Sequence, residues 1–103
     1  MIDTLTGRTY HVSHPLTALH TAALMDELRP QVSISDQEFT LDLAAVQEAD
    51  ITGINLLVKI NLLALTSHSK LLVLLTKGSQ LDELLHLTKI SDRIMLVYTA
   101  GWR

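Results

Sequence analysis

The segment from Phe39 to Leu65, FTLDLAAVQEADITGINLLVKINLLAL, decides the fold because it joins a strand, a connection and a long apolar helix. In residues 39–43 apolar and polar side chains alternate, which predicts a strand with one buried face. The connection ends in Asp50-Ile51-Thr52-Gly53, and a helix is expected from about Thr52 to Thr66. The start of such a helix favours anionic groups, because its first backbone N–H groups lack intrahelical partners. This loop is therefore the expected functional position.

The rest of the chain alternates between further strands and helices. A helix is expected over residues 16–28, closed by Arg29-Pro30, because proline lacks a backbone donor. The apolar run 70–75 suits an interior strand of a parallel sheet that is covered on both faces. Ser79 is a good N-cap for a further helix, with Asp82 at its N3 position. Shorter strands are expected over residues 9–13 and 94–98. This order predicts one α/β domain over residues 1–103, with a mostly parallel four- to five-stranded sheet and helices packed on it.

Composition excludes several classes of function. The net charge is −3, the lysines are scattered, and one Trp, two Tyr and one Phe leave little for base stacking, so nucleic acid is not an expected partner. The chain has no cysteine, which removes thiolate metal sites and disulfides. No apolar run resembles a signal peptide or is long enough to span a bilayer. A cytoplasmic protein without direct membrane insertion is expected, and Met1 suggests a complete chain.

No pattern of catalytic residues is present. The five histidines lack the spacing of a metal site such as HExxH, and no serine lies in a G-x-S-x-G turn. Four glycines give no phosphate-binding loop. The acidic pairs Glu48/Asp50 and Asp82/Glu83 are interpreted as loop solvation and helix-start charges. Neither an enzyme nor a cofactor or metal site is expected.

The helix after Gly53 is apolar around most of its circumference. At about 100° per residue, one arc is expected to face the core; it contains Ile54, Leu57, Val58 and Leu65. The opposite arc contains Leu56, Ile60 and Leu63. Either the sheet and neighbouring helices cover both arcs, or the second arc is an exposed apolar patch for a partner.

Several segments together resemble a STAS domain, most clearly from Phe39 to Tyr98. They are Leu41-Asp42-Leu43, Ala49-Asp50-Ile51-Thr52-Gly53-Ile54, Leu71-Leu72-Val73-Leu74, Ser79 to Ile90 and Ile94-Met95-Leu96-Val97. STAS domains include bacterial anti-sigma factor antagonists, a subunit of lipid-transporting ABC systems, and the cytoplasmic tail of sulfate transporters. In the antagonists the loop reads Asp-Ser-[Ser/Thr/Ala]-Gly, and a partner kinase phosphorylates the first hydroxyl residue.

Asp50 and Gly53 match that loop, but Ile51 occupies the phosphoacceptor position and cannot accept phosphate. Thr52 matches the second position. The resemblance therefore leaves two alternatives for Thr52: phosphorylation displaced by one residue, or an N-cap without a regulatory role. In either case Asp50 is expected to order the loop and Gly53 to permit close approach of a partner.

The resemblance implies a non-catalytic bacterial regulatory module of the anti-sigma factor antagonist type, acting in signal transduction and transcription regulation. Its partner would be an anti-sigma factor or switch kinase, bound through residues 50–53 and the following helix. The alternative is a cytoplasmic STAS subunit of a lipid-transporting ABC system, clamped to the ATPase subunit. A homo-oligomer and binding of a small molecule are further alternatives that the sequence leaves open.

Overall fold

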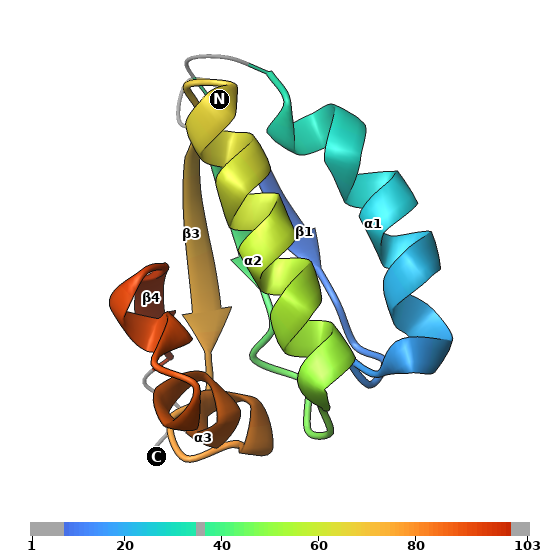
Figure 1. The fold of residues 1–103 in the computed structure, drawn as a ribbon, viewed down its shortest axis with the longest axis vertical. Helices are drawn as coiled ribbons and strands as arrows, with labels where there is room; N and C mark the ends of the chain where they lie inside the picture. The colour runs from blue at the N-terminus through green and yellow to red at the C-terminus, as the bar shows by residue number, and fades with distance from the viewer. Residues whose placement is uncertain (1–7, 35–36, 100–103) are drawn as a thin grey trace.

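The computed structural model describes residues 8–34 and 37–99, and these form one α/β unit around a single parallel sheet (Figure 1). The strands are β1 (Arg8–His11), β2 (Glu38–Asp42), β3 (Lys70–Leu75) and β4 (Met95–Tyr98). The helices are α1 (Ala18–Val32), α2 (Ile51–Thr66) and α3 (Gln80–Leu87), followed by the short 3₁₀ turn η2 (Ile90–Asp92). The strands lie in the order β1-β2-β3-β4, and every pair is parallel. The predicted fold class is confirmed, with four strands in the described part of the chain.

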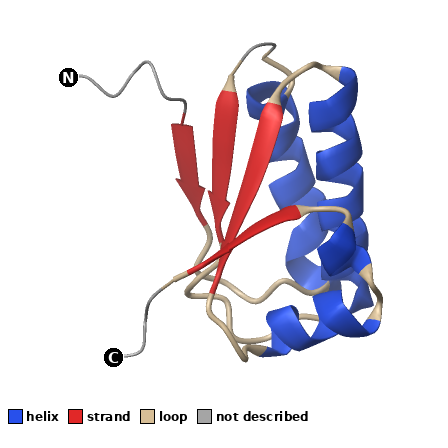
Figure 2. Cartoon of the chain, turned by 90° about the vertical axis from the view of Figure 1, so that its left-hand side faces the viewer, coloured by secondary structure: helices blue, strands red, loops and turns tan. Residues whose placement is uncertain are grey.

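One face of the sheet carries the core. Phe39 and Leu41 of β2 pair in register with Leu71 and Val73 of β3, so all four side chains lie on one face, and all are buried. Figure 2 shows the helices on one side of the sheet. The expectation that β3 is covered on both faces is wrong for the described residues. β3 does lie between two strands, but its residues alternate between buried and half-buried, and Leu72 and Leu74 belong to the second set.

Helix α1 continues past the predicted end at Arg29-Pro30 to Val32. Pro30 removes one backbone donor, but the turn is held by the Ser33 N–H, which donates to the Arg29 carbonyl at 3.2 Å. Val32 is fully buried and so anchors this last turn in the core. Burial of one side chain thus outweighs the local signal of the proline.

The last helix and strand, α3 and β4, lie close to where the local sequence pattern predicts them. The Ser79 hydroxyl accepts from the Asp82 N–H at 3.2 Å, which confirms the predicted cap of α3. β4 begins one residue later than expected, and Ile94 is buried just before it. Residues 1–7, 35–36 and 100–103 of the predicted domain lie outside the described residues.

Candidate functional site

The loops that precede α1 and α2 lie against each other at the carboxyl ends of β1 and β2. The Leu16 N–H donates to the Glu48 carbonyl at 2.8 Å, and the Leu16 carbonyl accepts from the Asp50 N–H at 3.2 Å. These two bonds form an isolated parallel bridge between Leu16 and Ala49, and both side chains are buried. The start of α2 is therefore attached to the segment that leads into α1.

Asp50 holds the start of α2 through its carboxylate. Oδ1 accepts from the Thr52 N–H at 2.9 Å and also from the Thr52 hydroxyl. The hydroxyl of Thr52 lowers the pKa of Asp50 most, and the backbone N–H groups of Thr52, Gly53 and Ala18 lower it further, although burial opposes them. Ala18 is the first residue of α1, so one carboxylate interacts with the amino ends of two helices. Asp50, and not Thr52, is the N-cap, which corrects the N-cap alternative for Thr52.

Gly53 lies where no side chain fits. A Cβ atom built on Gly53 would be 2.4 Å from the Leu16 carbonyl oxygen and 2.9 Å from Leu16 Cγ. Ordinary contacts between such atoms are about 3.5–4.0 Å. Gly53 thus permits a close approach to the chain's own Leu16, and the predicted close approach of a partner stays a prediction.

The two residues between Asp50 and Gly53 have different environments. The Ile51 side chain is 56% exposed at the first position of α2, and several aliphatic side chains further along the same helix are exposed as well. Thr52 is half-buried, and its hydroxyl is engaged by Asp50. The loop thus presents an apolar side chain outward and keeps its hydroxyl in an internal hydrogen bond.

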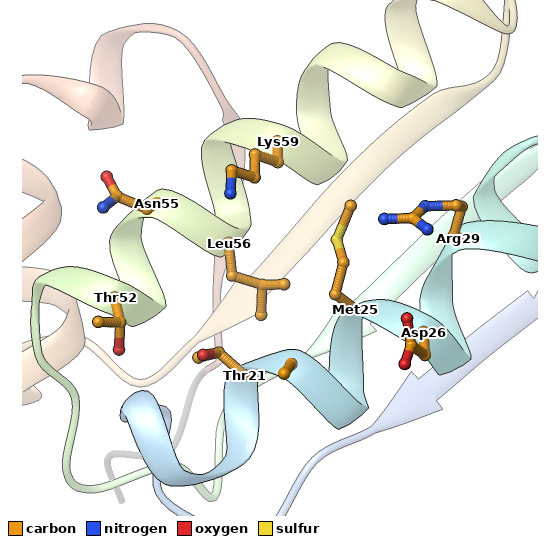
Figure 3. Close-up of a pocket in the computed structure, with 9 residues that line it drawn as sticks. Thr21, Met25, Asp26, Arg29, Thr52, Asn55, Leu56 and Lys59 are labelled. Carbon is orange, nitrogen blue, oxygen red and sulfur yellow. The ribbon is translucent and has the colours of Figure 1, made fainter.

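Thr52 also lies at one end of a groove of about 450 Å³ between α1 and α2 (Figure 3). The residues that line it are Thr21, Ala22, Met25, Asp26 and Arg29 of α1, with Thr52, Asn55, Leu56 and Lys59 of α2. The loop of residues 50–53 and this groove are therefore adjacent, and Thr52 belongs to both.

The predicted exposed patch on α2 is wrong. Leu56 and Ile60 are 3% and 0% exposed, and Leu63 is partly buried against the core. Val58 and Leu65, which were expected to face the core, are exposed instead. The helix is apolar on nearly all sides, so the sequence does not define which arc faces the sheet. Leu56 is buried where α2 faces α1, and the period of one helix cannot reveal such a neighbour.

A second polar cluster joins α3 to β4 and was not predicted. Asp82 is 5% exposed, and its carboxylate accepts from the Tyr98 hydroxyl at 2.8 Å and from the Gly78 N–H at 2.8 Å. His86 Nε2 lies 3.2 Å from the same carboxylate, and its Nδ1 lies 3.1 Å from the Ser91 hydroxyl. Burial and the hydrogen bond to Asp82 raise the pKa of Tyr98. Asp82 was interpreted as a helix-start charge, and no spacing in the sequence indicates its partner sixteen residues away.

The described residues contain no group of three or more histidine, aspartate or glutamate side chains placed to hold a metal ion. His14 and His20 stack with ring centroids 4.5 Å apart, but no carboxylate completes a ligand set with them in this part of the chain. No helix among the described residues is long and apolar enough to cross a membrane.

The sequence model of the STAS domain matches residues 3–100, which is nearly the whole chain. No curated protein matches the sequence.

Proposed function

This chain belongs to the STAS domain family, and we propose that it is a non-catalytic regulatory module that binds a protein partner. The contact would be formed by residues 50–53 and the amino-terminal half of α2, as in anti-sigma factor antagonists. STAS domains generally act in protein–protein interaction and not in catalysis. The bacterial cytoplasm is the proposed location.

The exposure of Ile51 is the observation that carries this proposal. Full burial of an aliphatic side chain contributes about 1.5–3 kcal/mol, so covering the exposed half of Ile51 contributes about 1 kcal/mol. The side chain stands on a loop whose backbone is already hydrogen-bonded on both sides. The centre of an interface is more apolar than its rim, so an apolar side chain held in place on this loop suits such a contact.

The state of Thr52 separates two versions of this function. A switch requires the Thr52 hydroxyl to leave Asp50 and accept a phosphate, which adds a charge of about −1.5 to −2 next to a carboxylate. Like-charge repulsion with Asp50 would then disturb both helix starts. A constitutive complex requires no such change, and isoleucine at the usual phosphoacceptor position favours it. This favours the second candidate function, a subunit held permanently on an ABC ATPase.

The first experiment is a pull-down from native cells with the tagged chain, followed by intact mass spectrometry. The wild type is compared with Ile51→Asp and with Leu87→Asp, a matched control on α3 whose side chain is also exposed. We expect Ile51→Asp to lose the partner and Leu87→Asp to retain it, with both variants folded by circular dichroism. Equal capture by all three proteins would refute the proposed contact.

The same experiment separates the two candidates. A kinase-like partner, together with a chain carrying the mass of one phosphate that Thr52→Val lacks, would establish a switch. An ABC ATPase partner with an unmodified chain would establish a constitutive transporter subunit.

A further inference from the structure

The groove between α1 and α2 combines an apolar floor with polar walls. Leu56 is buried at its base, and Met25 and Ala22 contribute the α1 side. Thr21, Thr52 and Asn55 add hydroxyl and amide groups toward the amino end of α2. A segment lying here would contact both helices at once, with its apolar side chains on Met25 and its polar groups along the walls.

Two basic side chains line the groove beside its apolar base, and neither forms a salt bridge among the described residues. Arg29 of α1 and Lys59 of α2 are both exposed and line the groove from opposite helices, and Figure 3 shows them on either side of Met25. The salt bridges in the described part of the chain involve other residues. Asp26 is the single acid in the lining, so the groove has a formal charge of +1 although the whole chain has −3.

We propose that this groove accepts an acidic side chain of the protein partner, carried next to an apolar side chain of the same segment. The carboxylate would lie between Arg29 and Lys59, and the apolar neighbour would cover Met25. Arginine is suited to bidentate contact with a carboxylate. This inference rests on the proposed function, because Thr52 makes the groove continuous with the loop that contacts the partner.

An acidic protein segment fits the groove better than an anionic membrane does. Attraction to a membrane surface increases with the number of basic residues that face it, and here two cations line a concave site on a chain of net negative charge. The concave apolar floor suits a side chain that enters it. Binding to lipid is therefore an outcome that the test must distinguish.

The probe is a short peptide of alternating leucine and glutamate, titrated into the ¹⁵N-labelled full chain and followed by amide chemical shifts. A leucine–glutamine peptide of the same length is the matched neutral control. We expect the acidic peptide to shift groove amides, such as those of Met25 and Lys59, with at least about tenfold higher affinity than the control. Salt should reduce this difference. Equal affinities, or shifts confined to other surfaces, would overturn the inference.

Charge reversal at the groove tests the same contact. Arg29→Glu and Lys59→Glu should each weaken the acidic peptide by several fold, and the double variant should abolish the preference for glutamate. Lys77→Glu is the control, because Lys77 is exposed and does not line the groove. Co-sedimentation with phosphatidylglycerol vesicles that the double variant loses, without any response to the peptide, would replace the inference with lipid binding.

Failure of the groove inference can be distinguished from failure of the proposed loop contact. If Ile51→Asp loses the partner while the groove variants bind partner and peptide as the wild type does, the loop contact stands and the groove inference falls. If the groove variants lose the peptide while Ile51→Asp captures the partner normally, the proposed loop contact fails and the groove inference is upheld.

Discussion

Replacement of Gly53 by alanine tests how tightly the two helix starts are joined. Alanine stabilises a helix by about 1 kcal/mol relative to glycine, so at an uncrowded position Gly53→Ala would make the protein more stable. Here the new methyl group would be 2.4 Å from the Leu16 carbonyl oxygen, well inside contact distance. That oxygen cannot retreat freely, because it accepts the Asp50 N–H at 3.2 Å.

The expected magnitude follows from these opposing terms. Overpacking costs about 1–3 kcal/mol, and weakening the Leu16–Asp50 hydrogen bond costs about 0.5–1.5 kcal/mol. After subtraction of the gain in helix propensity, Gly53→Ala should lower the free energy of unfolding by about 1–3 kcal/mol. For a domain of this size the midpoint of thermal unfolding should fall by roughly 5–20 °C.

Urea denaturation followed by circular dichroism measures this difference directly. Gly78→Ala is the informative control, since Gly78 has φ +83° and, apart from its chain neighbours, no atom of the described residues lies within 4 Å of the position that its Cβ would take. Its cost of about 1–2 kcal/mol would come from backbone conformation alone. If Gly53→Ala unfolds at the same urea concentration as the wild type or a higher one, the close contact with Leu16 does not exist as described.

Three further predictions concern the cap of α2, the orientation of α2 and the contact between α3 and β4. Because folding lowers the pKa of Asp50, its carboxylate stabilises the fold fully above the unfolded pKa of about 3.9, and this contribution is lost as the pH falls through the folded pKa. The difference in unfolding free energy between the wild type and Asp50→Asn should therefore shrink in acid. Urea denaturation across pH 2–5 measures it. Leu57→Ala should lower the free energy of unfolding by about 2–5 kcal/mol, because Leu57 is fully buried. The control Leu62→Ala, at an exposed position on the same helix, should change it by less than about 0.5 kcal/mol. Equal effects would contradict the observed orientation of α2. Tyr98→Phe should lower the free energy of unfolding by about 1–3 kcal/mol, because the buried Asp82 carboxylate loses a hydrogen-bond donor. If the Tyr98 phenol of the wild type has a pKa at or below its ordinary value, this hydrogen bond is refuted.

Local chemistry explains what could be predicted from the sequence. Alternation in residues 39–43 and the Ser79–Asp82 cap are short-range signals, and the structure contains both. The order of strands and helices then restricts the fold to a small set of parallel α/β arrangements. The family match over residues 3–100 agrees with that interpretation.

The wrong predictions concern features that depend on contacts between residues far apart in the sequence. A single helix period cannot orient α2, because α2 packs on α1 as well as on β3 and buries both Leu56 and Ile60. These neighbours come from distant parts of the chain. The Gly53–Leu16 contact and the Asp82–Tyr98 hydrogen bond likewise join residues far apart in sequence. Pro30 shows the converse case, where a strong local signal yields to the burial of Val32.

The bridge between Leu16 and Ala49 has a consequence for the kinetics of recognition. A loop that is already pinned by its neighbour has little conformational entropy to lose when a partner arrives. Complex formation should then resemble the docking of rigid surfaces, with an association rate set by encounter and orientation and not by a folding step. Because the same bridge joins the start of α2 to the segment that leads into α1, a displacement at Ile51 should be transmitted to the first turn of α1.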